Sequence, residues 1–198
     1  MHTPRRPPLT DRTAASLEGF LFPDTYLVPP QYGAAAFLEL MLKTFEERVR
    51  PELPQAGAPA PQLSFYEQVV LASIVEREAK LEEERAVIAA TFMNRLWEEM
   101  HLAADPTVQY ALATAWPPYW RAELSVDDLR VASPYNTYVV RGLPPTPIAN
   151  PGLAALKAVL QPEAAPYRYF VAKPDGSHAF AVTFEEHLNN LFRYQRGR

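Results

Sequence analysis

The stretch LASIVEREA, residues 71–79, is the middle of an apolar run that predicts a buried helix at the centre of the fold. Ser64 and Glu67 precede this run and match a capping box, in which each side chain binds the backbone N–H of the other residue. We therefore expect a helix that begins at Phe65 and ends near Lys80.

This predicted helix carries an acid, Glu76, on its apolar side. At about 100° per residue, Glu76 falls between Phe65 and Val69 on the helix surface. A carboxyl group there is costly unless it is neutral or paired, because burial disfavours the charged form. Enzymes use this cost to keep a glutamate protonated as a general acid near neutral pH. The alternative is that Glu76 reaches solvent or pairs with Arg77, Arg85 or Arg95.

Composition excludes several classes of function. The chain has 198 residues, 48% of them hydrophobic, which is enough for one core or for one domain with a small appendage. Its net charge of −4 and the lack of a basic block argue against nucleic acid as a partner. Cysteine is absent, and none of the 4 histidines has the spacing of a helical metal pair, so we expect no metal site. No apolar run approaches the ~20 residues that span a bilayer.

The remaining pattern predicts an α+β fold: a helix-rich domain with a small antiparallel β portion and an open groove. Periodicity and caps predict further helices at 33–49, 82–100, from Asp105, at 150–161 and at 183–195. Residues 167–172 and 178–182 bracket KPDGS and predict a β-hairpin. Residues 17–30 should form a short strand, a turn and an extended piece, and we expect the hairpin to lie beside them.

Several segments together resemble the YceG-like family of endolytic murein transglycosylases. They occur in the family's order and cover nearly the whole chain, from Leu17 to His187. The segments are LEGFLFPDTY (17–26), ASIVEREA (72–79), FMNRL (92–96), ADPTVQYAL (104–112), SPYNTYVVRGLPPTPIANPG (133–152), PYRYFVA (166–172) with the following SHAF, and TFEEH (183–187).

The resemblance implies a bacterial lyase that cuts peptidoglycan glycan strands between N-acetylmuramic acid and N-acetylglucosamine and leaves 1,6-anhydro ends. The family's essential acid corresponds to Glu76, and no cofactor is implied. Cell-wall synthesis proteins are further candidate partners. The family's transmembrane anchor has no counterpart here, so we expect a soluble fragment whose parent protein is anchored in the cell membrane and faces the periplasm or cell wall.

The sequence also indicates a division of the chain. Residues 1–16 are expected to be disordered or artificially added. Residues 17–62 are expected to form an extended segment, a helix and a Pro/Ala linker (PELPQAGAPAPQ, 51–62), and residues 63–198 the catalytic domain.

One acid suffices for this chemistry. Hydrolytic glycosidases usually place two carboxylates around the scissile bond. In a transglycosylase the sugar's own C6 hydroxyl attacks C1, so one glutamate donates a proton to the leaving oxygen and then accepts the hydroxyl proton. Glu78 is not expected to be a second group beside Glu76, because two residues turn it about 200° away around the helix.

A second set of residues is expected to bind the sugars: Glu18, Tyr26, Asn94, Arg95, Tyr135, Asn136, Thr137 and Tyr138. Structural roles remain open for all of them. In a structural role, the tyrosines of residues 135–138 would pack against the loop and the asparagine would cap a turn. Glu18 would form an ion pair with Arg95. Alternatively, Asn94 and Arg95 would orient Glu76 or form hydrogen bonds between two helices. Asp105 is expected to cap a helix rather than bind a ligand.

Three other functions are compatible with parts of the sequence. A noncatalytic glycan-binding or scaffold module would bind strands without turnover, and a glycan hydrolase would need a second carboxylate. A pyridoxal-phosphate lyase would need a Schiff-base lysine and a phosphate cradle, and the chain has few glycines and no Gly-rich loop.

Overall fold

The helix predicted around LASIVEREA is helix α2 (Phe65–Glu78) in a computed structural model of the chain, which describes residues 16–53, 63–113 and 123–194. The predicted capping box is confirmed. The hydroxyl of Ser64 accepts the N–H of Glu67 at 3.3 Å, and the carboxylate of Glu67 accepts the N–H of Ser64 at 2.7 Å. All residues from 68 to 75 are buried, so α2 is enclosed on every side along most of its length.

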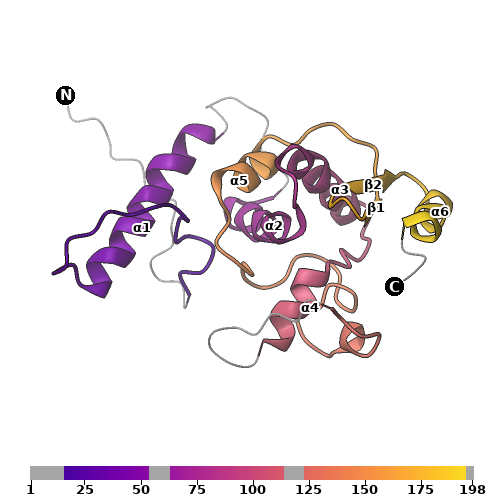
Figure 1. Ribbon diagram of the computed structural model, residues 1–198, viewed down its shortest axis with the longest axis horizontal. Helices are drawn as coiled ribbons and strands as arrows, with labels where there is room; N and C mark the ends of the chain where they lie inside the picture. Colours follow the sequence, from indigo (N-terminus) through magenta and orange to yellow (C-terminus); the bar gives the residue numbers. More distant parts are fainter. Residues whose placement is uncertain (1–15, 54–62, 114–122, 195–198) are drawn as a thin grey trace.

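Other helices surround α2, and one hairpin lies towards one end of the molecule, next to the C-terminal helix (Figure 1). This confirms the predicted helix-rich α+β class with a small antiparallel sheet, in which Tyr169 pairs with Ala181 and Ala172 with His178. The further elements are α1 (Ala34–Val49), α3 (Arg85–Trp97), α4 (Asp105–Leu112), α5 (Leu153–Leu160), α6 (Phe184–Tyr194), β1 (Tyr169–Ala172) and β2 (His178–Ala181), with 3₁₀ turns at Arg50–Glu52, Glu82–Glu84 and Asp128–Arg130.

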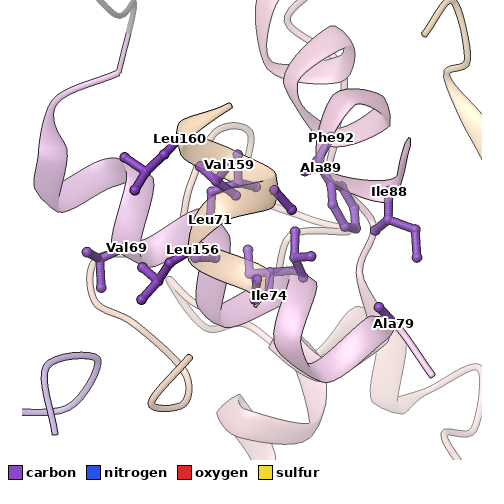
Figure 2. Packing of buried hydrophobic residues seen from close by; sticks show 14 of the residues in the cluster. Val69, Leu71, Ile74, Ala79, Ile88, Ala89, Phe92, Leu156, Val159 and Leu160 are labelled. Atoms are coloured by element: carbon purple, nitrogen blue, oxygen red, sulfur yellow. The ribbon is translucent and has the colours of Figure 1, made fainter. Parts of the chain in front are cut away.

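The main core lies where α2, α3 and α5 meet (Figure 2). Leu71 and Ile74 of α2, Phe92 of α3 and Leu156 of α5 are fully buried there. Helix α5 is largely apolar, and it reaches the core because it packs against both α2 and α3.

The prediction of a strand within residues 17–30 was wrong. Among the described residues this segment has a turn at 18–20 and no strand. The side-chain oxygen of Asn150 accepts the backbone N–H groups of Gly19 (2.7 Å) and Leu21 (3.2 Å). These are donors that a sheet would otherwise use. The segment lies beside α1, on the opposite side of the molecule from the hairpin, so the predicted contact between the two is also wrong (Figure 1).

The helix predicted from residue 82 begins as a 3₁₀ turn and becomes α-helical at Arg85, and two other predicted helix starts are also shifted. Helix α5 begins at Leu153 rather than at Asn150, whose side chain holds the N-terminal segment instead. Asp105 is the first residue of α4 rather than its N-cap, so its carboxylate makes no cap bond and is available for other contacts. Residues 1–15 of the predicted segment 1–16, most of the linker 51–62 and the predicted helix end at residue 195 fall outside the described residues, so the division into domains stays a prediction.

Candidate active site

A cavity of about 410 Å³ opens at the C-terminal end of α2. Its walls come from α2, α3, the start of α4, the hairpin and α6. The lining residues are Glu78, Arg95, Ala103, Asp105, Leu124, Leu129, Tyr138, Phe170, Val171, Ala172, His178, His187 and Leu191. Acidic, basic and phenolic groups thus converge on one concave and partly apolar site, which is the usual form of a ligand-binding cavity.

Glu78, the last residue of α2, is the acid of this cavity. Burial and, to a lesser extent, the nearby charge of Asp105 raise the pKa of its carboxyl group to about 8, against the opposing effect of Arg95. The side chain is half-buried, which leaves it reachable from the cavity. A carboxyl group that titrates near pH 8 is protonated at neutral pH and can donate a proton.

Arg95 lines the cavity from α3 and is almost completely buried. Its guanidinium donates hydrogen bonds to the carbonyl oxygens of Arg168 and Leu102, and it lies 5.4 Å from the centre of the Tyr169 ring. Burial lowers the pKa of this guanidinium. Because its donors hold backbone carbonyls, Arg95 acts on Glu78 as a fixed positive charge.

Asp105 and Tyr138 form a pair at the rim of the cavity. The Tyr138 hydroxyl donates a 2.6 Å hydrogen bond to the Asp105 carboxylate. Burial, together with the charge of Asp105, raises the pKa of the Tyr138 hydroxyl, so it remains a donor. Tyr138 is therefore the residue of the 135–138 loop that reaches the cavity, and the bond fixes the negative charge of Asp105 near Glu78.

Glu76, the acid favoured by the sequence pattern, is not among the residues that line this cavity. Its carboxylate accepts the backbone N–H of Gly152 at 3.1 Å, directly before α5. A negative charge is stabilised at a helix N-terminus by the exposed N–H groups and the helix dipole. In this position Glu76 connects α2 to α5, and its assignment as the catalytic acid stays a prediction.

Two other candidates in this loop form hydrogen bonds within the protein. Asn136 and Thr137 are buried. Asn136 donates to the carbonyl oxygens of Leu129 and Val131, whereas the Thr137 hydroxyl lies 2.8 Å from that of Thr107. The Asn136 bonds hold the loop against the 3₁₀ turn Asp128–Arg130, and the Thr137 contact holds it against α4, so together they position Tyr138.

Tyr135, Asn94, Glu18 and Tyr26 also have partners outside the cavity. The Tyr135 hydroxyl lies 2.9 Å from that of Thr146, and Asn94 donates to the carbonyl oxygens of Ala165 and Tyr167. Glu18 accepts a 2.6 Å hydrogen bond from Tyr110, so the expected pairing of Glu18 with Arg95 was wrong. The Tyr26 hydroxyl donates to the carbonyl oxygen of Phe22. Their predicted roles in sugar binding stay predictions.

Sequence reasoning did not identify Glu78, Asp105 or His187 as site residues. The helical angle had already placed Glu78 opposite Glu76, so a signal for Glu78 was present. The sequence did not show which side of α2 faces a cavity.

The family model described as the YceG-like family matches residues 3–193. An endolytic murein transglycosylase of Bacillus subtilis (strain 168) is 37% identical over 179 residues, which are 90% of this chain and 48% of that protein. One of Streptococcus pneumoniae serotype 2 (strain D39) is 31% identical over 176 residues, 88% of this chain and 32% of that protein. The chain thus spans about half or less of the length of these relatives.

A solved structure is also similar. The 2.6 Å crystal structure of a YceG-like protein from Listeria monocytogenes superposes with a TM-score of 0.76 at 35% identity. The match covers 91% of this chain and 58% of that one. Within the part of the chain that the structure describes, no helix has both the length and the apolar character needed to cross a bilayer.

Proposed function

This chain belongs to the YceG-like family, and from that premise we propose that it is the catalytic part of a peptidoglycan lytic transglycosylase whose general acid and base is Glu78. The substrate would be the glycan strand, cut internally between N-acetylmuramic acid and N-acetylglucosamine. The parent protein would act on the cell-wall side of the membrane, as its named relatives suggest.

The position of Glu78 beside this cavity, where burial raises its pKa, is the observation that carries this proposal. With a pKa of about 8, roughly nine in ten Glu78 side chains hold a proton at pH 7. The proton is held beside a cavity lined by both apolar and polar groups, where a sugar can approach it. An ordinary exposed glutamate, by contrast, would be almost fully ionised at this pH.

The reaction needs only this one acid. Glu78 donates its proton to the oxygen between the two sugars, the bond from that oxygen to C1 of the muramic sugar breaks, and N-acetylglucosamine leaves with a free hydroxyl. The C6 hydroxyl of the same muramic sugar attacks C1, and the Glu78 carboxylate takes the hydroxyl proton. Because the attacking and attacked atoms belong to one sugar residue, the step has a large proximity advantage and consumes no water.

Arg95 and Asp105 would shift the pKa of Glu78 in opposite directions. The negative charge of Asp105 favours the protonated, donating form of Glu78, whereas the positive charge of Arg95 favours the carboxylate that forms after donation. A group that must serve first as acid and then as base works best when neither form is strongly preferred near the operating pH.

The end groups of the products test the proposal. Purified peptidoglycan digested by this chain should yield fragments with 1,6-anhydro-muramic ends, identified by mass analysis. Predominantly reducing ends would contradict it and would indicate a hydrolase that uses water. Asp105, which lines the same cavity, would then be the candidate for the second carboxylate.

We further expect Asp105→Asn to move the pH profile of cleavage towards lower pH. Removing the negative charge makes ionisation of Glu78 easier, so the pKa of Glu78 falls and the acid is lost at a lower pH. The amide oxygen can still accept the Tyr138 hydrogen bond. The alkaline limb of kcat/KM against pH measures the effect, and the exposed turn residue Asp175, changed to asparagine, is the matched control. An unchanged or raised alkaline limb would contradict the expected effect of Asp105.

A further inference from the structure

His187 lines the cavity from α6 and has no role in the proposed chemistry. Its ring stacks on Tyr169 at 5.2 Å between ring centres and 25° between planes, and it also contacts the Phe184 ring at 6.2 Å. Two aromatic neighbours therefore fix the plane of the imidazole. The same Tyr169 ring lies under the guanidinium of Arg95, so His187 and Arg95 are positioned by one side chain.

The hydrogen-bonding state of this imidazole follows from its surroundings. Burial lowers the pKa of His187, and the positive charge of Arg95 lowers it further, so the ring is neutral at pH 7. The Nδ1 atom is enclosed and has no hydrogen-bond partner among the described residues. A buried N–H without a partner is rarer than an unpaired acceptor. The favoured tautomer therefore leaves the lone pair on Nδ1 and the hydrogen on Nε2.

Because Nδ1 is enclosed, the ring edge left to face the cavity is the one that carries Nε2. Several other residues that line the cavity are apolar, among them Leu129, Val171 and Leu191. A neutral N–H donor in a cavity with apolar walls matches an acetamido group, which has a carbonyl oxygen to accept the bond and a methyl group to pack. Both sugars of a glycan strand of N-acetylmuramic acid and N-acetylglucosamine carry that group.

We infer that His187 is a substrate-binding residue that donates its Nε2–H to the carbonyl oxygen of an N-acetyl group on the glycan strand. This inference rests on the proposed function, because it takes the strand as the ligand of the cavity. His187 does not transfer a proton to the reacting bond. Its effect is on binding and on the placement of the sugar relative to Glu78.

The test measures binding of a tetrasaccharide of alternating N-acetylglucosamine and N-acetylmuramic acid in the full chain carrying Glu78→Gln, so that no cleavage interferes. Adding His187→Phe keeps an aromatic ring on Tyr169 but removes the donor, and we expect binding to weaken about fivefold to tenfold. His187→Gln places an amide N–H near the position of Nε2 and should restore most of the affinity. His187→Asn reaches only the position of Nδ1 and should not.

The same tetrasaccharide without its acetyl groups is the decisive comparison. If the bond goes to the acetamido carbonyl, the His187→Phe protein and the protein that retains His187 should bind the de-N-acetylated strand equally. His101 provides the control: its Nδ1 is also enclosed without a partner in the described part of the chain, but it does not line the cavity, so His101→Gln should not change binding. Thermal unfolding of each variant checks that it is folded.

Tight binding by the His187→Phe protein, or failure of His187→Gln to restore affinity in a folded protein, would overturn this inference. So would a loss on His187→Phe that is as large for the de-N-acetylated strand. Failure of the proposed function is recognised separately, because the chain with Glu78 and His187 intact would then release no anhydro-ended fragments from peptidoglycan.

Discussion

Glu78→Gln is expected to lower the rate of glycan-strand cleavage by about a thousandfold or more, within or above the range typical for loss of a general acid. Glutamine is close to glutamate in size but carries no transferable proton, so the strand still binds while the leaving oxygen stays unprotonated. The loss should appear in kcat with little change in KM. Release of anhydro-ended fragments from purified peptidoglycan, followed over time by mass analysis, measures it.

Glu76→Gln is the matched control, because the same substitution is made two residues away on the same helix. An amide oxygen can still accept the Gly152 N–H, so activity should stay within a few-fold of the parent and the fold should persist. The two variants together decide between the acid favoured by the sequence and the acid favoured by the cavity. If Glu76→Gln stops cleavage and Glu78→Gln does not, the assignment of Glu78 is wrong.

The second large effect concerns stability. Glu78→Gln should make the protein more stable than the parent at pH 8 by on the order of 3 kcal/mol, a value already reduced for the partial exposure of the side chain. The pKa of Glu78 is about 8 in the folded protein and about 4.5 in the unfolded chain. Below pH 4.5 the carboxyl is protonated in both states and costs nothing. Between these values only the unfolded state releases its proton, so the parent loses stability as the pH rises, and above pH 8 the loss is complete.

Urea unfolding of the parent and the Glu78→Gln protein at pH 4, 6 and 8 measures this difference. Other titrating groups contribute nearly equally to both proteins and cancel in the comparison. The stability gain of the variant should therefore be small at pH 4 and grow towards pH 8. A gain that does not change with pH would show that the carboxyl is not held neutral by the folded structure, which would also remove the basis for its role as an acid.

Local sequence was sufficient for most of the secondary structure. The capping box at Ser64 and the hairpin around KPDGS were predicted correctly, because caps and tight turns depend on contacts between residues a few positions apart. The strand expected within residues 17–30 was wrong because its backbone donors bind the side chain of Asn150, more than a hundred residues along the chain. No local pattern contains that contact.

For the candidate site, the residues named from the sequence fall into two groups: some line the cavity and others are buried in the loop. The resemblance pointed to Arg95 and Tyr138, and both line the cavity. It also pointed to Asn136 and Thr137, which are buried and hold the loop against the 3₁₀ turn Asp128–Arg130 and against α4. Polar side chains in a long loop look alike in sequence whether they face a ligand or satisfy the loop's own backbone. Only the packing of the loop separates the two.

The sequence alone determined that α2 is the central helix and that it ends in two acids on opposite sides, Glu76 and Glu78. It did not determine which acid faces the cavity. Hydrophobic periodicity identifies the buried side of a helix only when the other side is exposed to solvent, and α2 is buried all round from residue 68 to 75. Tertiary packing determined which acid faces the cavity. The backbone N–H of Gly152, directly before α5, binds Glu76. Helices α3, α4 and α6 and the hairpin line the cavity beside Glu78, where burial raises its pKa.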